Sequence, residues 1–297
     1  MKLKQYALTN IGKERDNNED AFAMCPNLEN VSWDTNEMHR YIPLGAYGAL
    51  FAVADGMGGA NAGEIASSIA IETVKKHFSK ENISRYFEED EIKMMLQQLF
   101  IDADTTIKNK VLEIPDTSGM GTTLVLCWMI GGKAYVAWCG DSRCYIYNPI
   151  MGLNQITKDH SYVQEMVDKG EIKAKDAFMH PDGNIITKGL GDFEVDDASM
   201  PDIISINIKP NDLLLLCSDG LCGFCENSLI EKVIDRNYLD VNRCGDELLQ
   251  IALEAGGYDN ITIAIASLIS DNEIQPHKLS FLEQIEAFIS RKCHRRR

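Results

Sequence analysis

The chain has 297 residues, of which 45% are hydrophobic and 25% are charged, and a formal net charge of -16. This composition is typical of a globular protein with one large domain, and the negative charge argues against nucleic acid or an anionic membrane as a partner. No apolar run approaches the roughly 20 residues that span a bilayer, and the N-terminus lacks a secretory signal, so we expect no transmembrane segment and a cytoplasmic location.

The order of predicted elements indicates an α+β fold. Segments rich in β-branched and aromatic residues predict strands at 3–9, 49–54, 121–129, 133–139, 143–147, 203–208, 212–217 and 260–268. Helical periodicity predicts helices over 62–79, 89–110, 227–236 and 242–255. Consecutive strands joined by short turns favour antiparallel pairing. We therefore expect a four-layer α-β-β-α sandwich, with two packed, mainly antiparallel sheets flanked by helices.

Three segments interrupt this plan. Residues 26–47 read as a long loop or irregular hairpin, and residues 162–185 as a polar excursion that contains helix. In residues 271–297, five apolar side chains share one helical face ahead of a basic tail. We expect a catalytic domain over 1–270 and a C-terminal amphipathic helix over 271–297, which either packs on its own domain or docks on a partner or a membrane surface.

Aspartates recur at the ends of apolar runs. Three runs end at Asp55, Asp141 and Asp219, and a fourth begins at Asp259. Each one alone is explained by a turn, but four together suggest carboxylates that converge. Converging carboxylates repel one another unless a divalent cation neutralises them. Hard oxygen ligands select magnesium, manganese or calcium.

Two polar stretches extend this hypothesis. The stretch "RDNNED" adds Arg15, Glu19 and Asp20, which either form a solvated loop or supply a phosphate clamp and carboxylates that orient water. The glycine-rich stretch "DGMGGANAGE" has the spacing of neither common phosphate-binding loop. A tight turn at which the Asp55 carboxylate and the Gly56 carbonyl face a cation is the better interpretation.

The thiols of "CSDGLCGFC" are not expected to carry chemistry. Cys217, Cys222 and Cys225 lack the second pair of ligands that a zinc site needs, so packing in the core is favoured. A cysteine-based phosphatase would need an arginine where this chain has Gly223. The carboxylate of Asp219, within the same stretch, is the functional candidate.

Seven short motifs, in the same order along the chain, resemble those of the metal-dependent serine/threonine protein phosphatases (PPM family, type 2C), in the bacterial form. They are Arg15 with Glu19-Asp20, "DGMGG" at 55–59, "SGMGTTL" at 118–124, "GDSR" at 140–143, "DHS" at 159–161, "SDGL" at 218–221 and "DNIT" at 259–262. The resemblance implies hydrolysis of phosphoserine and phosphothreonine in proteins at a centre with two Mg²⁺ or Mn²⁺ ions.

The resemblance also implies the metal ligands. Asp55 would bridge both ions, and Asp219 and Asp259 would complete the first. The Gly56 carbonyl, with water held by Glu19, would serve the second ion. A water that bridges the two cations would attack phosphorus directly, so neither a phosphoenzyme nor a cysteine nucleophile is required.

The remaining implied roles lie around this centre. Asp20 would orient water, Asp141 together with Asp219 would match a weaker third metal site, and Arg15 would be catalytic as the clamp that binds the substrate phosphate. Residues 162–185 would form a flap beside the site. The implied partners are phosphorylated proteins and a serine/threonine kinase that shares these targets, and we expect a monomer.

One position departs from the pattern of many members. Met57 stands where a histidine would act as the general acid for the leaving alcohol, so His160 and His180 are the candidates for that role. Two rival functions remain open: a catalytically silent family member that acts as a binding module, and a metal-dependent hydrolase of small phosphate esters. The retained aspartates argue against the first rival, and only an assay separates the second.

Overall fold

The computed structural model describes residues 1–33, 41–58, 62–83, 88–191 and 200–270. The predicted C-terminal helix over 271–297 and part of the predicted loop over 26–47 lie outside these residues. In the described part of that loop, a short 3-10 helix spans Leu28–Asn30 and a short strand, β3, spans Ile42–Pro43. A second 3-10 helix spans Pro115–Thr117.

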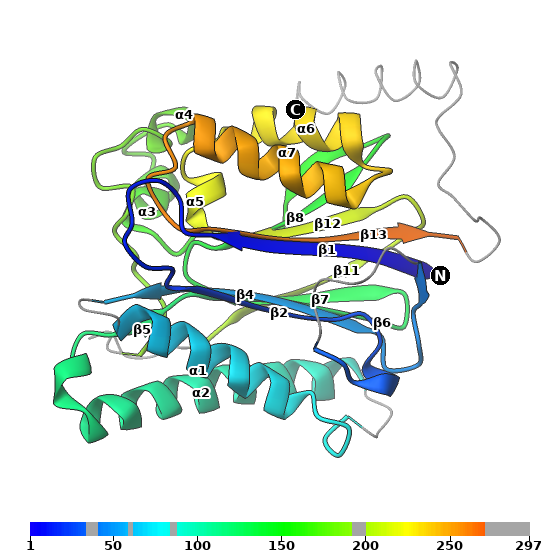
Figure 1. The fold of residues 1–297 in the computed structure, drawn as a ribbon, viewed down its shortest axis with the longest axis horizontal. Helices are drawn as coiled ribbons and strands as arrows, with labels where there is room; N and C mark the ends of the chain where they lie inside the picture. The colour runs from blue at the N-terminus through cyan, green and yellow to red at the C-terminus, as the bar shows by residue number, and fades with distance from the viewer. Residues whose placement is uncertain (34–40, 59–61, 84–87, 192–199, 271–297) are drawn as a thin grey trace.

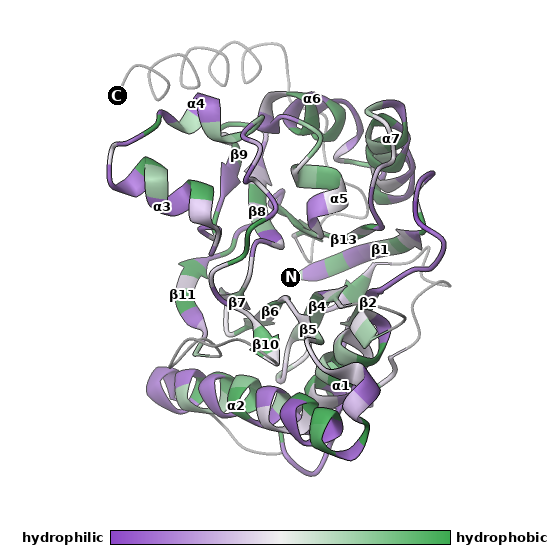
Figure 2. Cartoon of the chain, turned by 90° about the vertical axis from the view of Figure 1, so that its left-hand side faces the viewer, coloured by the Kyte–Doolittle hydropathy of each residue, from purple (hydrophilic) through white to green (hydrophobic). Residues whose placement is uncertain are grey.

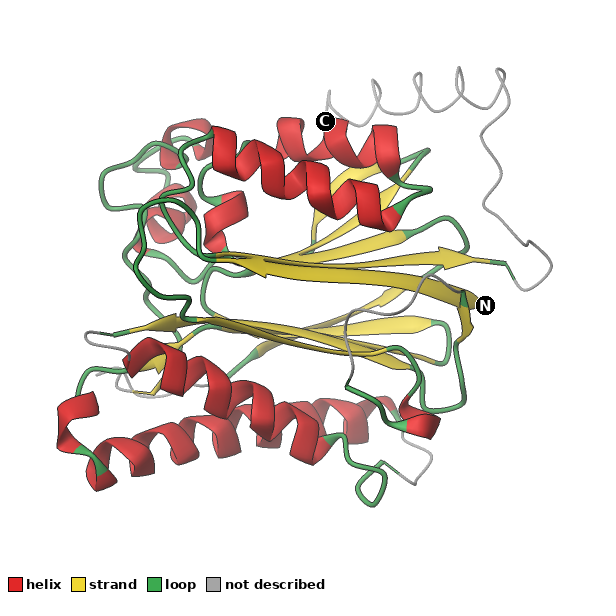
Figure 3. Ribbon diagram, viewed as in Figure 1, coloured by secondary structure: helices red, strands yellow, loops and turns green. Residues whose placement is uncertain are grey.

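Two antiparallel sheets form the centre of the molecule (Figures 1 and 3). The first sheet has the order β3, β1 (Lys2–Asn10), β13 (Ile261–Ile269), β12 (Leu213–Cys217), β8 (Arg143–Asn148) and β9 (Gly152–Gln155). The second has the order β10 (Leu190–Gly191), β5 (Gly121–Thr122), β4 (Ala49–Met57), β6 (Leu124–Ile130), β7 (Lys133–Cys139) and β11 (Asp202–Asn207), and β2 (Asp20–Cys25) also pairs with β4.

Helices cover the outer face of each sheet (Figure 1). The second sheet is covered by α1 (Ala62–His77) and α2 (Glu89–Glu113), and the first by α5 (Asp219–Cys222), α6 (Asn227–Asn237) and α7 (Val241–Glu254). The predicted four-layer α-β-β-α sandwich is therefore confirmed. None of the helices in the described ranges has both the length and the apolar character needed to cross a bilayer.

Strand alternation divides the core into three layers. Along β4, Phe51 and Val53 point between the two sheets, whereas Leu50, Ala52 and Ala54 point toward α1 and α2. Because neighbouring side chains of a strand face opposite ways, one strand contributes to two core layers. A third layer lies between the first sheet and the helices α5 to α7.

Four strands, β2, β3, β9 and β10, were missing from the sequence-based prediction, and β3 and β10 have only two residues each. The strands β2 and β9 were not predicted because each is short and lacks a long β-branched run. Pairing with β4 and β8 is what makes them strands, and this pairing depends on tertiary structure. The predicted excursion over 162–185 does contain helix, namely α3 (Tyr162–Asp168) and α4 (Ala174–Ala177).

Candidate active site

The aspartates at the strand ends meet at one end of the sandwich. The second sheet supplies Asp55, near the end of β4, and Asp141, which follows β7. The first sheet supplies Asp219, directly after β12, and Asp259, just before β13. Figure 2 views this end of the molecule, with α5 on one side of the strand ends and β4 and β5 on the other.

Asp20 lies directly opposite Asp55 in the β2–β4 ladder. Its Oδ2 accepts a hydrogen bond of 2.7 Å from the Ser218 hydroxyl, whose oxygen in turn accepts one of 2.9 Å from the Thr262 amide. The backbone of Asp55 is bound from the other side, where its amide donates to Thr123 Oγ1 at 3.0 Å. Hydroxyl groups thus hold both carboxyl-bearing residues in place.

Close backbone packing brings Glu19 to the same place. A Cβ atom on Gly56 would lie 2.2 Å from the Gly63 carbonyl oxygen and 2.6 Å from that of Glu19, so only glycine fits there. The Gly56 amide donates to the Glu19 carbonyl at 3.1 Å, and the Glu19 amide donates to Asn260 Oδ1 at 2.7 Å. The end of β4, the start of α1 and the "RDNNED" loop therefore meet at Gly56.

The assembled carboxyl groups resist ionisation. Burial, together with the charges of Asp219 and Asp259, raises the pKa of Asp20 to about 7 against hydrogen bonds that lower it. Burial and the charge of Asp259 raise the pKa of Asp219 to about 6. Burial and neighbouring carboxylates also raise the pKa of Asp55 and of Asp141 well above the ordinary range. A cation is the natural compensation for such a group of charges.

The donor set fits a hard divalent cation. Asp20, Asp141 and Asp219 each have a buried Oδ1 atom with no hydrogen-bond partner among the described residues. Asp55 lies close enough to Asp219 to lower the pKa of that group against the effects that raise it. Within the described ranges no three acidic, His or Cys side chains surround one point as a preformed metal cage.

Arg15 lies at the edge of this cluster. Its Nη2 donates to Asp259 Oδ2 at 2.6 Å, and its side chain is 50% exposed. Burial by itself would lower the pKa of Arg15. The hydrogen bond to Asp259 and the charges of Asp259, Asp219 and Glu19 raise it by a larger amount, so the pKa lies above its ordinary value. The guanidinium thus lies beside the carboxylates, with half of its side chain open to solvent.

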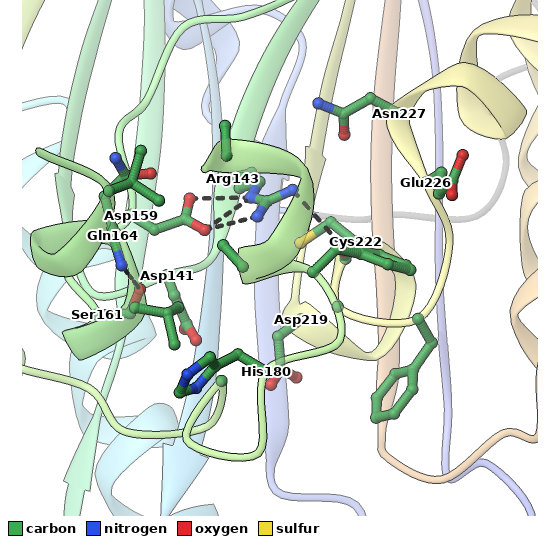
Figure 4. A pocket seen from close by; sticks show the side chains of 18 of the residues that line it. Asp141, Arg143, Asp159, Ser161, Gln164, His180, Asp219, Cys222, Glu226 and Asn227 are labelled. Carbon is green, nitrogen blue, oxygen red and sulfur yellow. Dashed lines mark hydrogen bonds and ion pairs between the residues drawn. The ribbon is translucent and has the colours of Figure 1, made fainter. Parts of the chain in front are cut away.

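A cavity of about 790 Å³ extends from the carboxylates between the 162–185 flap and the segment after α5 (Figure 4). Asp141 and Asp219 line one end of it, and His180 lies beside them. Arg143 lies deeper, and its guanidinium donates hydrogen bonds of 2.6–3.1 Å to both carboxylate oxygens of Asp159. The cavity can accept side chains of a peptide whose phosphate lies at the carboxylates.

The two candidate histidines differ in position. His180 lines the cavity, and its Nδ1 lies 3.2 Å from the Asp182 amide nitrogen and 3.7 Å from an oxygen of the Asp182 carboxylate. The ring of His160 instead accepts from the Gly140 amide at 3.1 Å and lies 3.4 Å from Asp202. His160 is not among the described residues that line the cavity.

Several residues that hold the site in place received no role from the sequence. Ser218 and Asn260 orient Asp20 and Glu19, Thr123 binds the Asp55 amide, and Arg143 pairs with Asp159. All five are within the motifs quoted above, and two of them, Ser218 and Asn260, stand directly beside a motif aspartate. A hydroxyl or amide next to such an aspartate is the signal that could have found these two.

The thiols of the "CSDGLCGFC" motif are buried. Cys217, Cys222 and Cys225 are each at most 1% exposed, and they pack with the helices that cover the first sheet. All eight cysteines in the described ranges are free. Burial and a contact with Cys217 raise the pKa of Cys222 well above the ordinary range, so it is poorly suited to be a nucleophile.

The α-β-β-α sandwich with acidic strand ends at one edge defines a phosphatase of the metal-dependent class. The family model for protein phosphatase 2C matches residues 5–261. The chain therefore belongs to the protein phosphatase 2C family, as its motifs predicted, and is a protein phosphatase.

Relatives agree over nearly the whole chain. The serine/threonine phosphatase stp of Listeria monocytogenes is 31% identical over 257 residues, which cover 86% of this chain and 92% of that protein. The crystal structure of Stp1 from Staphylococcus aureus is 32% identical, with a TM-score of 0.76 over 90% of this chain and 96% of that one. The catalytic domain of PstP, solved in complex with two manganese ions, is 29% identical, with a TM-score of 0.71 over 91% and 99% of the two chains.

Proposed function

We propose that this protein hydrolyses phosphoserine and phosphothreonine in other proteins, at the end of the sandwich where its aspartates converge, with two Mg²⁺ or Mn²⁺ ions. The observation that carries the proposal is the convergence of Asp20, Asp55, Asp141 and Asp219 from both sheets: all four have raised pKa values, and all but Asp55 have a buried oxygen without a partner among the described residues. The solved PstP structure with two manganese ions supports the choice of metal.

In this proposal the carboxylates divide the work of holding the ions. Asp55, Asp219 and Asp259 would hold the first ion, and Asp55, the Gly56 carbonyl and water held by Glu19 would serve the second. Asp141 and Asp219 would hold a weaker third ion. Bound divalent cations would make a water molecule acidic near neutral pH and offset the charge of the phosphoryl oxygens.

The chain's own residues then act on the substrate. Asp20, fixed by Ser218, accepts a hydrogen bond from water and so orients it. Arg15 exchanges Asp259 for two phosphoryl oxygens, because a planar guanidinium binds a phosphate with two parallel hydrogen bonds. His180, in its protonated imidazolium form, donates a proton to the leaving alcohol oxygen and becomes neutral, a role that Met57 cannot take because its side chain carries no acidic proton. Direct attack by water leaves no phosphoenzyme.

The cavity favours a protein substrate over a small phosphate ester. A phosphate group occupies only a small part of about 790 Å³, and the remainder runs between the flap and the Phe224–Ser228 segment. Peptide residues that flank the phosphorylated side chain can fill it. The cavity walls carry mixed polar and apolar groups, as ligand pockets commonly do.

The test is dephosphorylation of phosphoserine, phosphothreonine and phosphotyrosine peptides with Mn²⁺ or Mg²⁺ added. We expect turnover of the first two peptides, and its loss in Asp55→Asn and Asp219→Asn, because an amide lacks the charge that the ions require. Asp16→Asn is a matched control, since Asp16 is exposed in the same loop that carries Arg15. Full turnover in excess chelator would contradict the proposal.

We further propose that the protein is a cytoplasmic monomer that opposes a serine/threonine kinase acting on the same targets. The buried free cysteines support a reducing compartment. The assignment of a kinase follows from chemistry, because a phosphatase for phosphoserine and phosphothreonine needs an enzyme that forms these esters. The oligomeric state is measured by light scattering.

A further inference from the structure

The turn that carries Asp141 is tied to the root of the flap through one residue, His160. Gly140 and His160 exchange two hydrogen bonds. The Gly140 amide donates to the His160 ring at Nδ1 (3.1 Å), and the His160 amide donates to the Gly140 carbonyl (3.0 Å). Gly140 has a φ of +107°, and a Cβ atom there would lie 2.5 Å from the Thr123 side chain. The turn therefore depends on outside hydrogen bonds for its position.

His160 also joins the two ends of the flap. Its carbonyl accepts a hydrogen bond of 2.9 Å from the Thr187 amide, and the Tyr162 amide donates to the Ile185 carbonyl at 2.9 Å. Ser161 forms an antiparallel bridge with Ile186. The chain thus enters and leaves the 162–185 flap at a point that His160 attaches to Gly140.

The His160 ring is fixed on its remaining sides. It stacks on Trp138 with ring centroids 6.0 Å apart, and its side chain is 14% exposed. Its Nε2 faces Asp202, whose carboxylate is shared with Lys188. Burial and the charge of Lys188 lower the pKa of His160 against the effect of Asp202, which keeps Nδ1 free to accept the Gly140 amide.

The residues before and after His160 in the sequence face the cavity, whereas His160 does not. Asp159 and Ser161 line the cavity, whereas His160 lies behind them and touches the turn before Asp141. On the far side of that turn, Ser142 shares a hydrogen bond of 2.8 Å with Thr123, which also binds the Asp55 amide. Hydrogen bonds, together with the backbone of residues 140–142, therefore link Asp55 to the flap.

We propose that His160 is a positioning residue that sets the Asp141 turn and the root of the flap as one unit. Cation binding at Asp141 would then order the flap, and a fixed flap would present Asp141 to the cation. This inference rests on the proposed function, because that function assigns Asp141 to a metal site. His160 does not touch the substrate.

Two substitutions of His160 test the contributions of its two ring nitrogens separately. In His160→Asn the amide oxygen takes the place of Nδ1 and can still accept the Gly140 amide, whereas in His160→Gln the amide reaches the Nε2 position and faces Asp202. We expect His160→Asn to bind Mn²⁺ nearly as the wild type does. His160→Gln should bind the weakest Mn²⁺ ion roughly two- to tenfold less tightly, the range for loss of one hydrogen bond.

The measurements are Mn²⁺ titration by calorimetry and hydrogen exchange of the peptides that contain Gly140, Tyr162 and Thr187. We expect His160→Gln to speed exchange in all three peptides, and Mn²⁺ to slow it in the wild type at one common concentration. Asp202→Asn removes the charge that faces Nε2 and pairs with Lys188 but leaves the Gly140 hydrogen bond intact, so it should resemble His160→Asn. Equal behaviour of the Asn and Gln variants would overturn the proposal.

Other outcomes are also decisive. If His160→Gln does not fold, the wild-type titration still tests the proposal, because protection of Gly140 and of the flap at clearly different Mn²⁺ concentrations would refute the coupling. A wild-type protein that binds no Mn²⁺ would overturn both this inference and the proposed function. Tight Mn²⁺ binding by the wild type with an unaltered flap in His160→Gln would overturn this inference alone.

Discussion

Replacing Asp20 with asparagine should stabilise the metal-free protein at neutral and alkaline pH. Asp20 is 9% exposed, one of its oxygens has no partner among the described residues, and burial raises its pKa from 3.8 to about 7. Between these two values the unfolded chain releases a proton that the folded chain keeps. The free energy of unfolding of the wild type therefore falls as pH rises from about 4 to 7 and then levels off.

The size of the effect follows from the pKa shift. Each unit corresponds to about 1.4 kcal/mol, so the shift of Asp20 sets an upper value of about 4 kcal/mol at pH 8. Neighbouring carboxyl groups share the protons, which reduces the expected gain to about 2–4 kcal/mol. An amide oxygen can still accept the hydrogen bond from Ser218, so the substitution should not open the site.

The assay is urea unfolding in excess chelator at pH 5, 6, 7 and 8 for the wild type, Asp20→Asn and the exposed control Asp16→Asn. The advantage of Asp20→Asn over the wild type should grow with pH up to about 7, while the control follows the wild type. Saturating Mn²⁺ should shrink the advantage, because cations compensate the same charge. Parallel curves at all pH values, or a variant less stable than the wild type at pH 8, would refute the reasoning.

Substitutions at three further residues test individual roles. Arg15→Ala should lower kcat/KM roughly ten- to a hundredfold with little change in melting temperature or Mn²⁺ affinity, and Arg15→Lys should recover only part of the loss; wild-type rates in Arg15→Ala would exclude a clamp. Cys222→Ser should keep Mn²⁺-stimulated turnover, so an inactive but folded variant would show that the thiol has a chemical role. His180→Gln should lose roughly a hundredfold or more on a phosphothreonine peptide but far less on p-nitrophenyl phosphate, whose leaving group needs no proton; equal losses on both would rule out a proton donor.

Sequence periodicity predicted most of the fold. The long apolar segments that become β4, β12 and β13 are almost wholly buried, and helices such as α1 and α7 have one apolar face. The pattern of apolar residues within each segment is therefore enough to predict its conformation. Antiparallel pairing followed from short turns such as that between β6 and β7. The strands β2 and β9 could not be found this way, because only their partners stabilise them.

The candidate site could likewise be predicted only in part from the sequence. Aspartates at the ends of apolar runs are visible in the sequence because a strand end must be followed by a polar turn, and their repetition pointed to a cation. Their chemistry depends on distance, which the sequence does not contain. Only the packing of two sheets sets Asp55 against Asp219 and raises the pKa of both.

The two candidate histidines also show what the sequence predicts and what the tertiary structure decides. Both His160 and His180 follow from the sequence as candidates for a proton donor, since each is a lone imidazole near a motif. The tertiary structure places His180 in the cavity with Asp141 and turns His160 toward Gly140. Residue type determined which chemistry was available to this protein, and contacts between distant segments decided where each group could use it, because hydrogen bonds and charge interactions act over a few ångströms in space.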